Sequence, residues 1–499
     1  MTRMLQNVSF QRLRSRRLVT ALLLLFASAI CSDLDNSSVV LAVQQPRSAK
    51  SGRATQDATG RFQVAVNAYQ AERYAEAQRE LLPLLAANPD SFEINELTGL
   101  VYVALGQDEK AHTYLAKAVR LNPTSAAAHT TLAANLVRVH RNTEAEAQFR
   151  KVVELEPQSY DANHNLGEFY IQAHALAQAL PYLKRAQEIN PRAYNNGYDL
   201  ALACEQTGNL DAARSQVEQL IKINDTAELH SLLAEIEERA KNYVVSAAQF
   251  EQAVHMNPSE SNILEWGAEL LLHQTFEPAV EVFKAGMARY PRSRRLELGL
   301  GIALYGLGHF DDGAKAFFQA SDMNAADPLP LIFLGKAYEN LSPPTRDEVR
   351  SRLHRFLETE PRNASIPYFY AMTLWKQSQS QPETAQFAEI ETLLKSAVSL
   401  GPRNADAYLQ LGILYASQHK YNDAMTQYEE ALKINPNTAA VHYRLGQALA
   451  RTGATARAQQ EFAEFVRLQA HEVDETEKQN AEIQQFVYTL RNLNTAGKE

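Results

Sequence analysis

Cysteine is nearly absent from this sequence of 499 residues. With only Cys31 and Cys204, the chain can build neither a disulfide framework nor a cysteine-rich metal cluster. At Cys204 we expect a small buried hydrophobic residue rather than a reactive thiol. Glycine and proline are also scarce, whereas apolar residues make up 45% of the chain and charged residues 21%. This composition favours α-helix and excludes an intrinsically disordered chain.

The sequence also lacks the common catalytic and cofactor-binding motifs. It contains no glycine-rich phosphate loop, His-Glu-x-x-His, Gly-x-Ser-x-Gly or Cys-x-x-Cys. Its thirteen histidines are scattered, and we expect His112, His129, His140 and His174 on helix surfaces or in turns. We therefore predict a protein that is not an enzyme, with no catalytic residues, no cofactor and no metal site.

An excess of positive charge is missing as well. The formal net charge is −9, and the first 31 residues carry five arginines and no acidic residue, so the remainder carries −14. General binding to nucleic acid needs basic side chains that neutralise phosphates. We therefore predict proteins or peptides as partners, no nucleic acid, and contact with a membrane only through the amino-terminal segment.

One short apolar run stands out near the amino end. A basic stretch, residues 1–17, is followed by apolar residues 18–30, and Asp33 ends the run. This order is typical of a secretory signal peptide, and Ala-Ser-Ala at 27–29 offers a cleavage site, with Val-Leu-Ala at 40–42 as a second. We predict a signal peptide at 1–30, a flexible linker at 31–57, and a periplasmic or secreted protein.

Three alternatives for this segment stay open. Residues 18–31 could remain as an uncleaved membrane anchor, although the run is short for a span of about 20 residues. Ala-Ile-Cys at 29–31 could be a lipidation site, although the bulky isoleucine stands where a small residue is expected. Ser-Arg-Arg at 15–17 could belong to a twin-arginine export signal, although the residues that follow depart from its usual pattern.

Prolines recur with a nearly constant spacing along the rest of the chain. The first four are 34 residues apart, and Asp225 takes the place of the fifth, after which the interval is 33. Such a period indicates a repeat architecture. The periodic prolines are Pro89, Pro123, Pro157, Pro191, Pro258, Pro291, Pro361, Pro402 and Pro436.

Residues 405–436 show what recurs with this period. Two apolar patterns of helical spacing flank a short polar turn. Leu411 and Tyr415 lie four residues apart in the first pattern, as do Ala424 and Tyr428 in the second, so each pair shares one helix face. Small residues, Gly412 and Ala424, predict a close approach of the two helices.

The pattern Leu-Gly-x-x-Tyr, followed by Ala, Tyr or Phe, Ala and Asn-Pro, resembles the tetratricopeptide repeat. The resemblance covers about residues 58–472 and implies an all-α, right-handed superhelical solenoid of about twelve helix-turn-helix repeats, whose first helices line the concave side. The expected repeats are 58–91, 92–125, 126–159, 160–193, 194–226, 227–259, 260–293, 294–327, 328–363, 364–404, 405–436 and 439–472.

Some parts of the array depart from the pattern. The first repeat has a degenerate first helix around residues 62–69, as terminal repeats often do. Repeats nine and ten are lengthened, and we expect extra loops at 341–348 and 377–388, either as contact loops or as tolerated insertions. The segment 473–499 is expected to add a capping helix and a tail, with apolar residues that cover the last repeat.

The resemblance also assigns groove-facing positions within each repeat. In repeats four to six these positions are acidic, which predicts attraction of basic segments or an ordinary solvated face. In repeats seven to ten they are apolar, which predicts peptide binding or packing between first helices. The acidic set is Asp161, Glu168, Glu205, Glu235 and Glu238; the apolar set is Leu298, Ile302, Tyr305, Ile332, Tyr368, Met372 and Trp375. Phe333 and Phe369 are expected in the core instead.

Two known recognition devices of the family are missing. Asn165 has no basic residues at the matching positions of neighbouring repeats, so a carboxylate clamp is not expected. An asparagine ladder is also absent. We predict a non-enzymatic, exported scaffold that binds protein segments in its concave groove. The alternatives are a structural or assembly subunit of an envelope complex, such as one for polysaccharide export or pilus assembly, and a carbohydrate-binding module.

Overall fold

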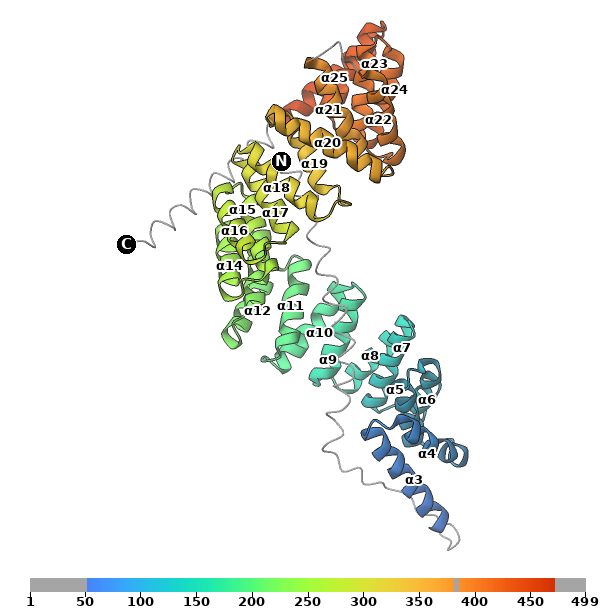
Figure 1. Cartoon of the computed structure of the whole chain (residues 1–499). Coiled ribbons are helices and arrows are strands. Elements are labelled where there is room, and N and C mark those ends of the chain that lie inside the picture. Colours follow the sequence, from blue (N-terminus) through green and yellow to red (C-terminus); the bar gives the residue numbers. More distant parts are fainter. Residues whose placement is uncertain (1–51, 381–385, 472–499) are drawn as a thin grey trace, which may run out of the picture. The chain divides into compact units, whose positions relative to one another are not determined.

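The computed structural model describes residues 52–380 and 386–471. Within these residues every regular element is a helix and no strand occurs, so the predicted all-α solenoid of helix pairs is confirmed. The chain divides into two compact units, 1–225 and 226–499, whose described helices are labelled in Figure 1. The division falls where Asp225 replaces a repeat proline.

Over its described residues the first unit is built from five helix pairs. Its first helices are α3 (Gly52–Gln70), α5 (Phe92–Ala104), α7 (Ala126–Arg138), α9 (Tyr160–Gln172) and α11 (Tyr194–Gln206). Its second helices are α4 (Tyr74–Ala87), α6 (Asp108–Leu121), α8 (Asn142–Leu155), α10 (Leu176–Ile189) and α12 (Leu210–Ile223).

The second unit continues the same pairing. Its first helices are α13 (Ala227–Arg239), α15 (Glu260–Leu272), α17 (Arg294–Gly306), α19 (Leu329–Ala337), α21 (Ile366–Ser380), α23 (Ala405–Ser417) and α25 (Ala439–Arg451). Its second helices are α14 (Tyr243–Met256), α16 (Phe276–Arg289), α18 (Phe310–Met323), α20 (Pro343–Thr359), α22 (Phe387–Leu400) and α24 (Tyr421–Ile434), and residues 455–471 are also helical. A short 3₁₀ turn, η2 (Tyr338–Asn340), follows α19.

Side-chain caps from serine, threonine or asparagine explain where many of the described first helices begin. The side chain of Ser91 accepts a hydrogen bond from the backbone N–H of Ile94, which satisfies one of the free donors at the start of α5. Pro89, which stands two residues earlier, cannot continue the preceding helix. The same cap is made by Ser125, Ser159, Thr226, Ser259, Ser293 and Asn404.

A left-handed residue ends the first helix of most repeats. Gly106 has φ +69°, its N–H donates to the carbonyl of Val103, and the next N–H donates to Tyr102. This pair of bonds is a Schellman motif. The left-handed position is held by glycine again at Gly208, Gly308 and Gly453, but by a larger residue at Glu72, His140, His174, Lys241, Gln274 and His419.

The predicted close approach of the two helices of a repeat is confirmed. A Cβ atom added to Gly412 would lie 2.4 Å from Cε1 of Tyr428, so that ring lies directly on the glycine, and Ala424 is fully buried. The same contact joins Gly99 to Leu115, Gly167 to Leu183, Gly267 to Phe283, Gly301 to Phe317 and Gly446 to Phe462.

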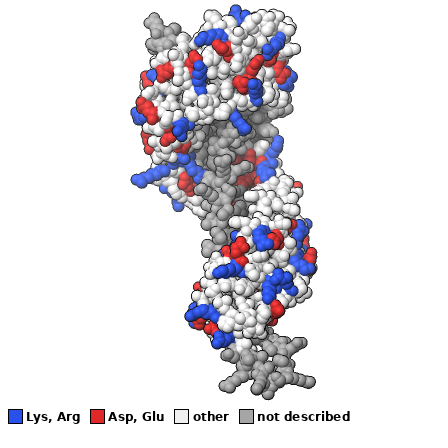
Figure 2. Space-filling view, turned by 90° about the vertical axis from the view of Figure 1, so that its right-hand side faces the viewer, with Lys and Arg blue, Asp and Glu red and all other residues white. Residues whose placement is uncertain are grey.

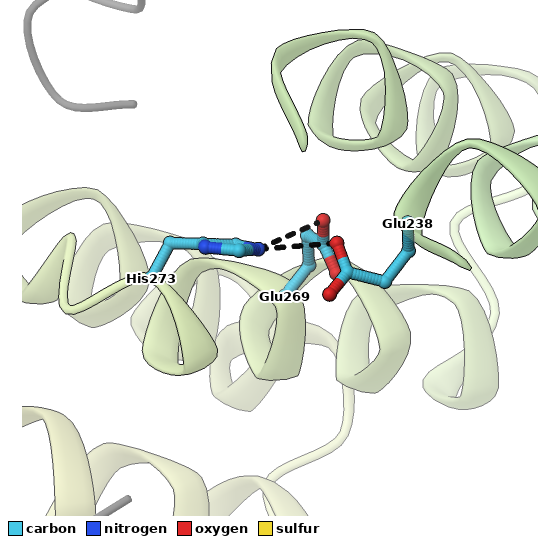
Figure 3. A group of neighbouring side chains, drawn as sticks. All are labelled: Glu238, Glu269 and His273. Atoms are coloured by element: carbon cyan, nitrogen blue, oxygen red, sulfur yellow. Dashed lines mark hydrogen bonds and ion pairs between the residues drawn. The ribbon is translucent and has the colours of Figure 1, made fainter. Parts of the chain in front are cut away.

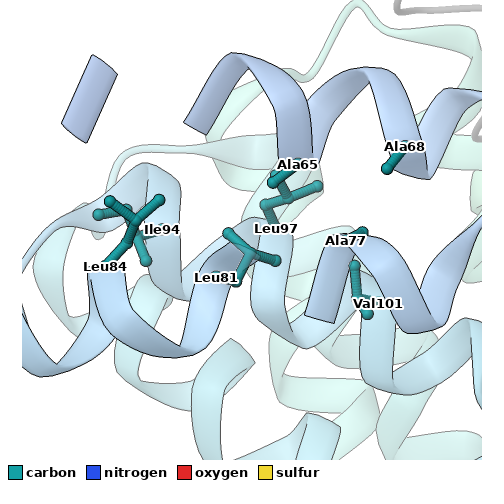
Figure 4. Packing of buried hydrophobic residues seen from close by; sticks show 8 residues of the cluster. All are labelled: Ala65, Ala68, Ala77, Leu81, Leu84, Ile94, Leu97 and Val101. Atoms are coloured by element: carbon teal, nitrogen blue, oxygen red, sulfur yellow. The ribbon is translucent and has the colours of Figure 1, made fainter. Parts of the chain in front are cut away.

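Small residues make the core of the first repeat. Ala65 and Ala68 of α3 are fully buried beside Leu81 of α4 and Leu97 and Val101 of α5 (Figure 4). The helix α3 begins at Gly52, so residues 52–57, which we assigned to the flexible linker, are helical. Alanine, glutamine and arginine favour helix, and they extend α3 beyond the repeat pattern.

The expected extra loops are largely helical. Residues 343–348 form the start of α20, because proline suits the first turn of a helix, and residues 377–380 and 387–388 belong to α21 and α22. Residues 381–385, the leader at 1–30 and the capping helix at 473–499 lie outside the described residues. None of the described helices is both long enough and apolar enough to cross a lipid bilayer.

Candidate functional site

The first helices form the inner side of each unit. In the first unit α5 contacts both α3 and α7, and α9 contacts α11; in the second, α15 contacts α17 and α19 contacts α21. Second helices of neighbouring repeats contact each other less. Because neighbours approach most closely on the inside of a curve, the first helices carry the concave face that the resemblance implied.

Most of the predicted apolar groove residues are accessible on this face. Ile302, Tyr305, Ile332, Tyr368, Met372 and Trp375 are all half-buried, so each offers part of its side chain to a partner. Leu298 is instead buried and belongs to the core. Phe333 and Phe369 are buried as predicted.

The three aromatic groove residues lie against different neighbours. The hydroxyl of Tyr305 accepts a hydrogen bond of 2.6 Å from the side-chain amide of Asn340 in η2. Tyr368 packs edge-on against Phe369, and Trp375 packs edge-on against Phe387 at the start of α22. Tyr368 and Trp375 share a face of α21, whereas Tyr305 is held separately at the end of α17.

Two of the predicted acidic residues come together in the first unit. Asp161 and Glu168 lie on α9, and Asp199 faces them from α11. Burial and the charge of Glu168 raise the pKa of Asp199 to about 7. Burial and the charges of Asp161, Asp199 and Glu168 raise the pKa of Tyr160 to about 12. This group is therefore less negative at neutral pH than its composition indicates.

The remaining acidic residues lie in other places along the chain. Glu205 is buried at the end of α11, and Glu235 and Glu238 belong to α13 in the second unit. Figure 2 shows acidic and basic side chains interspersed on the face in view. Opposite charges also pair at short range, for example Arg138 with Asp108 at 2.9 Å.

One cluster of side chains was not predicted. Glu269 and His273 lie four residues apart at the end of α15, and Glu238 approaches them from α13 (Figure 3). Nε2 of His273 is 3.1 Å from Oε2 of Glu238 and 3.6 Å from Oε1 of Glu269. The ring of Tyr243 lies against the imidazole, with 4.4 Å between centroids. We call these three residues the Glu-Glu-His cluster.

Burial and close contact change the pKa values of two residues in the Glu-Glu-His cluster. Burial raises the pKa of Glu269. Burial opposes protonation of His273, but the hydrogen bond to Glu238 and the nearby carboxylate of Glu269 outweigh it and raise the pKa of His273 to about 9. The sequence did contain a signal for this cluster. Glu269 and His273 are four residues apart, and Glu238 lies one repeat earlier, on the neighbouring first helix.

The positions of His129 and Cys204 can also be compared with the sequence predictions. His129 was expected on a surface or in a turn, but it is buried. Its two ring nitrogens form hydrogen bonds with the side chain of Gln148 at 2.7 Å and with the carbonyl of Pro123 at 3.1 Å. Cys204 is buried as predicted, and this burial raises the pKa of its thiol.

Several known proteins resemble this chain. Over 252 residues it is 23% identical to mouse superkiller complex protein 3, covering 48% of this chain and 15% of the relative. Over 71 residues it is 34% identical to the tetratricopeptide repeat and J domain-containing co-chaperone DNJ1 of Cryptococcus neoformans, covering 14% of each. The chain thus spans about a seventh of the length of these relatives.

Solved structures with similar folds include yeast Tom70, with TM-score 0.39 and 15% identity over 81% of this chain and 97% of that one. The Naa15/Naa10 complex bound to HypK matches with TM-score 0.40 and 15% identity over 82% of this chain and 68% of that one. Family models described as tetratricopeptide repeats match residues 60–126, 130–194, 171–236 and 414–453. The chain therefore contains tetratricopeptide repeats in both of its units.

Proposed function

We propose that this chain is a non-enzymatic scaffold, exported from the cytoplasm, that binds an apolar protein segment on the concave face of its second unit. The observation that carries the proposal is the row of half-buried apolar side chains on α17, α19 and α21. Aromatic side chains that are held in place but still accessible are the residues that most often dominate binding energy.

Preorganisation supports this assignment. Tyr305 is fixed by Asn340 and Trp375 by Phe387, so a bound segment would not have to order these rings. Tyr368, Met372 and Trp375 follow one another at helical spacing on α21 and offer a continuous apolar stripe. An extended peptide with apolar side chains fits such a stripe. The acidic group on α9 and α11 favours a basic segment at the first unit.

Export rests on the leader pattern of residues 1–30. The test is to determine the amino terminus of the protein purified from its native host. A start between Ser28 and Val43 supports cleavage and export, whereas recovery of intact Met1 in the cytoplasm contradicts it.

Binding is tested with a peptide display library and the full chain. The wild type should enrich segments rich in apolar and aromatic residues. The triple variant Tyr305→Ala, Tyr368→Ala, Trp375→Ala should bind the enriched peptides at least about tenfold more weakly, because each hot-spot side chain contributes roughly 1–2 kcal/mol.

A matched control removes exposed apolar side chains from second helices of the same unit. Val245→Ala, Met256→Ala and Met323→Ala change residues that are 40–45% exposed on α14 and α18. This control should bind like the wild type. Equal binding by both triple variants, with unchanged circular dichroism, contradicts the proposed surface.

A second candidate function is a structural or assembly subunit that uses the edge of the solenoid. It is favoured by Phe387, which lies within the 377–388 segment and is 40% exposed. Phe387→Ser would abolish assembly in that case, whereas Tyr305→Ala, a change in the groove, would leave assembly intact.

A further inference from the structure

The Glu-Glu-His cluster brings together three groups that can each bind a metal ion. One ligand atom from each of Glu238, Glu269 and His273 lies within 4.8 Å of the other two. Figure 3 shows the imidazole and both carboxylates pointing toward one another from α13 and α15. An imidazole with two carboxylates is a donor set that suits zinc and related divalent ions.

The distances fit a metal of ordinary size. With metal–ligand bonds of about 2.1 Å, neighbouring ligands of a tetrahedral ion lie about 3.4 Å apart. The two distances from Nε2 of His273, 3.1 and 3.6 Å, lie on either side of that value. An ion could therefore enter with small side-chain movements.

The surroundings of Glu269 are a separate observation. Glu269 is only 5% exposed, and its Oε1 atom, which faces the cluster, lies 3.6 Å from Nε2 of His273, longer than an ordinary hydrogen bond. Buried polar atoms in proteins are nearly always satisfied, because a carboxylate without a partner is costly to bury. Coordination to a cation would satisfy this oxygen.

We propose that Glu238, Glu269 and His273 bind one divalent transition-metal ion, with Zn²⁺ as the best match. The two carboxylates would balance both charges of the ion. Nε2 of His273 would coordinate it after releasing its proton to solvent, and water would complete the tetrahedral shell. This site is independent of the proposed peptide surface on α17, α19 and α21.

The position of the site gives the ion a structural consequence. Glu238 belongs to repeat six, whereas Glu269 and His273 belong to repeat seven. A bound ion would therefore link two neighbouring first helices. Since repeat proteins draw their stability from such interfaces, the ion would stabilise the second unit against unfolding.

The test uses the untagged full chain after treatment with a chelator. Zn²⁺ is titrated by calorimetry at pH 7.5, and Co²⁺ is added separately to record the visible spectrum. We expect one equivalent of Zn²⁺ to bind and Co²⁺ to give the intense absorption of tetrahedral coordination. Glu238→Gln, Glu269→Gln and His273→Gln should each weaken Zn²⁺ binding by about 10- to 100-fold or more.

His442→Gln is the matched control, because His442 also pairs with a glutamate, Glu461, at 2.7 Å but lies outside the cluster. It should bind Zn²⁺ like the wild type. Glu238 is the most exposed of the three ligands, so Glu238→Gln is the variant least expected to unfold the protein. A loss of Zn²⁺ binding in this variant can therefore be separated from a loss of folding. Absence of Zn²⁺ binding in the wild type, or equal affinity in all four variants, would overturn the proposal.

Discussion

At the scale of single residues, the contact between a first-helix glycine and a second-helix ring controls how closely the two helices pack. Tyr428 is almost fully buried against Gly412. A ring in this position fills the space that any side chain at the glycine would need. Glycine is therefore needed at this position to leave room for the ring of Tyr428, and not because of the backbone conformation of Gly412.

We predict that Gly412→Ala destabilises the protein by about 1–3 kcal/mol, because the added methyl group would overlap Tyr428. Gly60 in α3 is the control, since a Cβ atom there meets no atom within 4 Å. Gly60→Ala should be neutral or stabilise by up to about 1 kcal/mol through helix propensity. Urea unfolding measures both, and equal effects would contradict the packing argument.

Asp199 provides a prediction for pH. Its pKa is about 7 in the folded chain and about 4 in the unfolded chain, so the unfolded state ionises first as the pH rises. The folded state thus loses stability between pH 4 and 7. Relative to the wild type, Asp199→Asn should gain roughly 1–3 kcal/mol between pH 5 and 8.

Chemical denaturation of both proteins at several pH values checks this expectation. Asp161→Asn, an exposed change in the same acidic group, is the control. A stability difference between Asp199→Asn and the wild type that is constant with pH would show that Asp199 is not the responsible group.

At the scale of elements, the turn between the helices of a repeat depends on a left-handed residue. Gly106 adopts this conformation without strain, but a side chain there costs about 1–2 kcal/mol. Gly106→Ala should therefore destabilise by about 1 kcal/mol, whereas His140→Gly should be neutral or stabilising. The urea concentration at the midpoint of unfolding measures the stability of both variants, provided that the dependence of the unfolding free energy on urea is unchanged. Destabilisation by His140→Gly would contradict the role of the left-handed residue.

Most helices could be predicted from the sequence, because residues that recur with the repeat period occupy the same structural position in each repeat. The prolines located the ends of second helices, and Leu411 and Tyr415 marked a core-facing stripe. The start of α20 at Pro343 was missed, because proline begins helices as well as ending them.

The candidate sites were predicted less completely than the fold. Tyr305, Tyr368 and Trp375 followed from their places in the repeat, since one helix face decides their exposure. The Glu-Glu-His cluster was not found, because Glu238 is 35 residues from His273 in the chain. Glu238 meets the other two residues only because the neighbouring first helices α13 and α15 pack in a particular register. The spacing of residues within one helix does not reveal that register.

At the scale of the whole molecule, the division at Asp225 predicts two unfolding steps. Phe149 and Phe283 are buried large side chains of the first and second unit, and replacing either with alanine should cost about 3–5 kcal/mol. In calorimetry Phe149→Ala should lower one transition and Phe283→Ala the other. A single transition that both substitutions lower equally would show that the units unfold together.

The left-handed turns also offer a set of positions for spectroscopic probes. His140, His174 and His419 are exposed and recur at the same place in their repeats. In the described part of the chain the native thiol, Cys204, is buried, so in a Cys31→Ser background cysteines introduced at two of these histidines would react selectively with a dye or spin label. Probes at His140 and His419 would then report, as a distance change, any rearrangement of the two units when a partner binds.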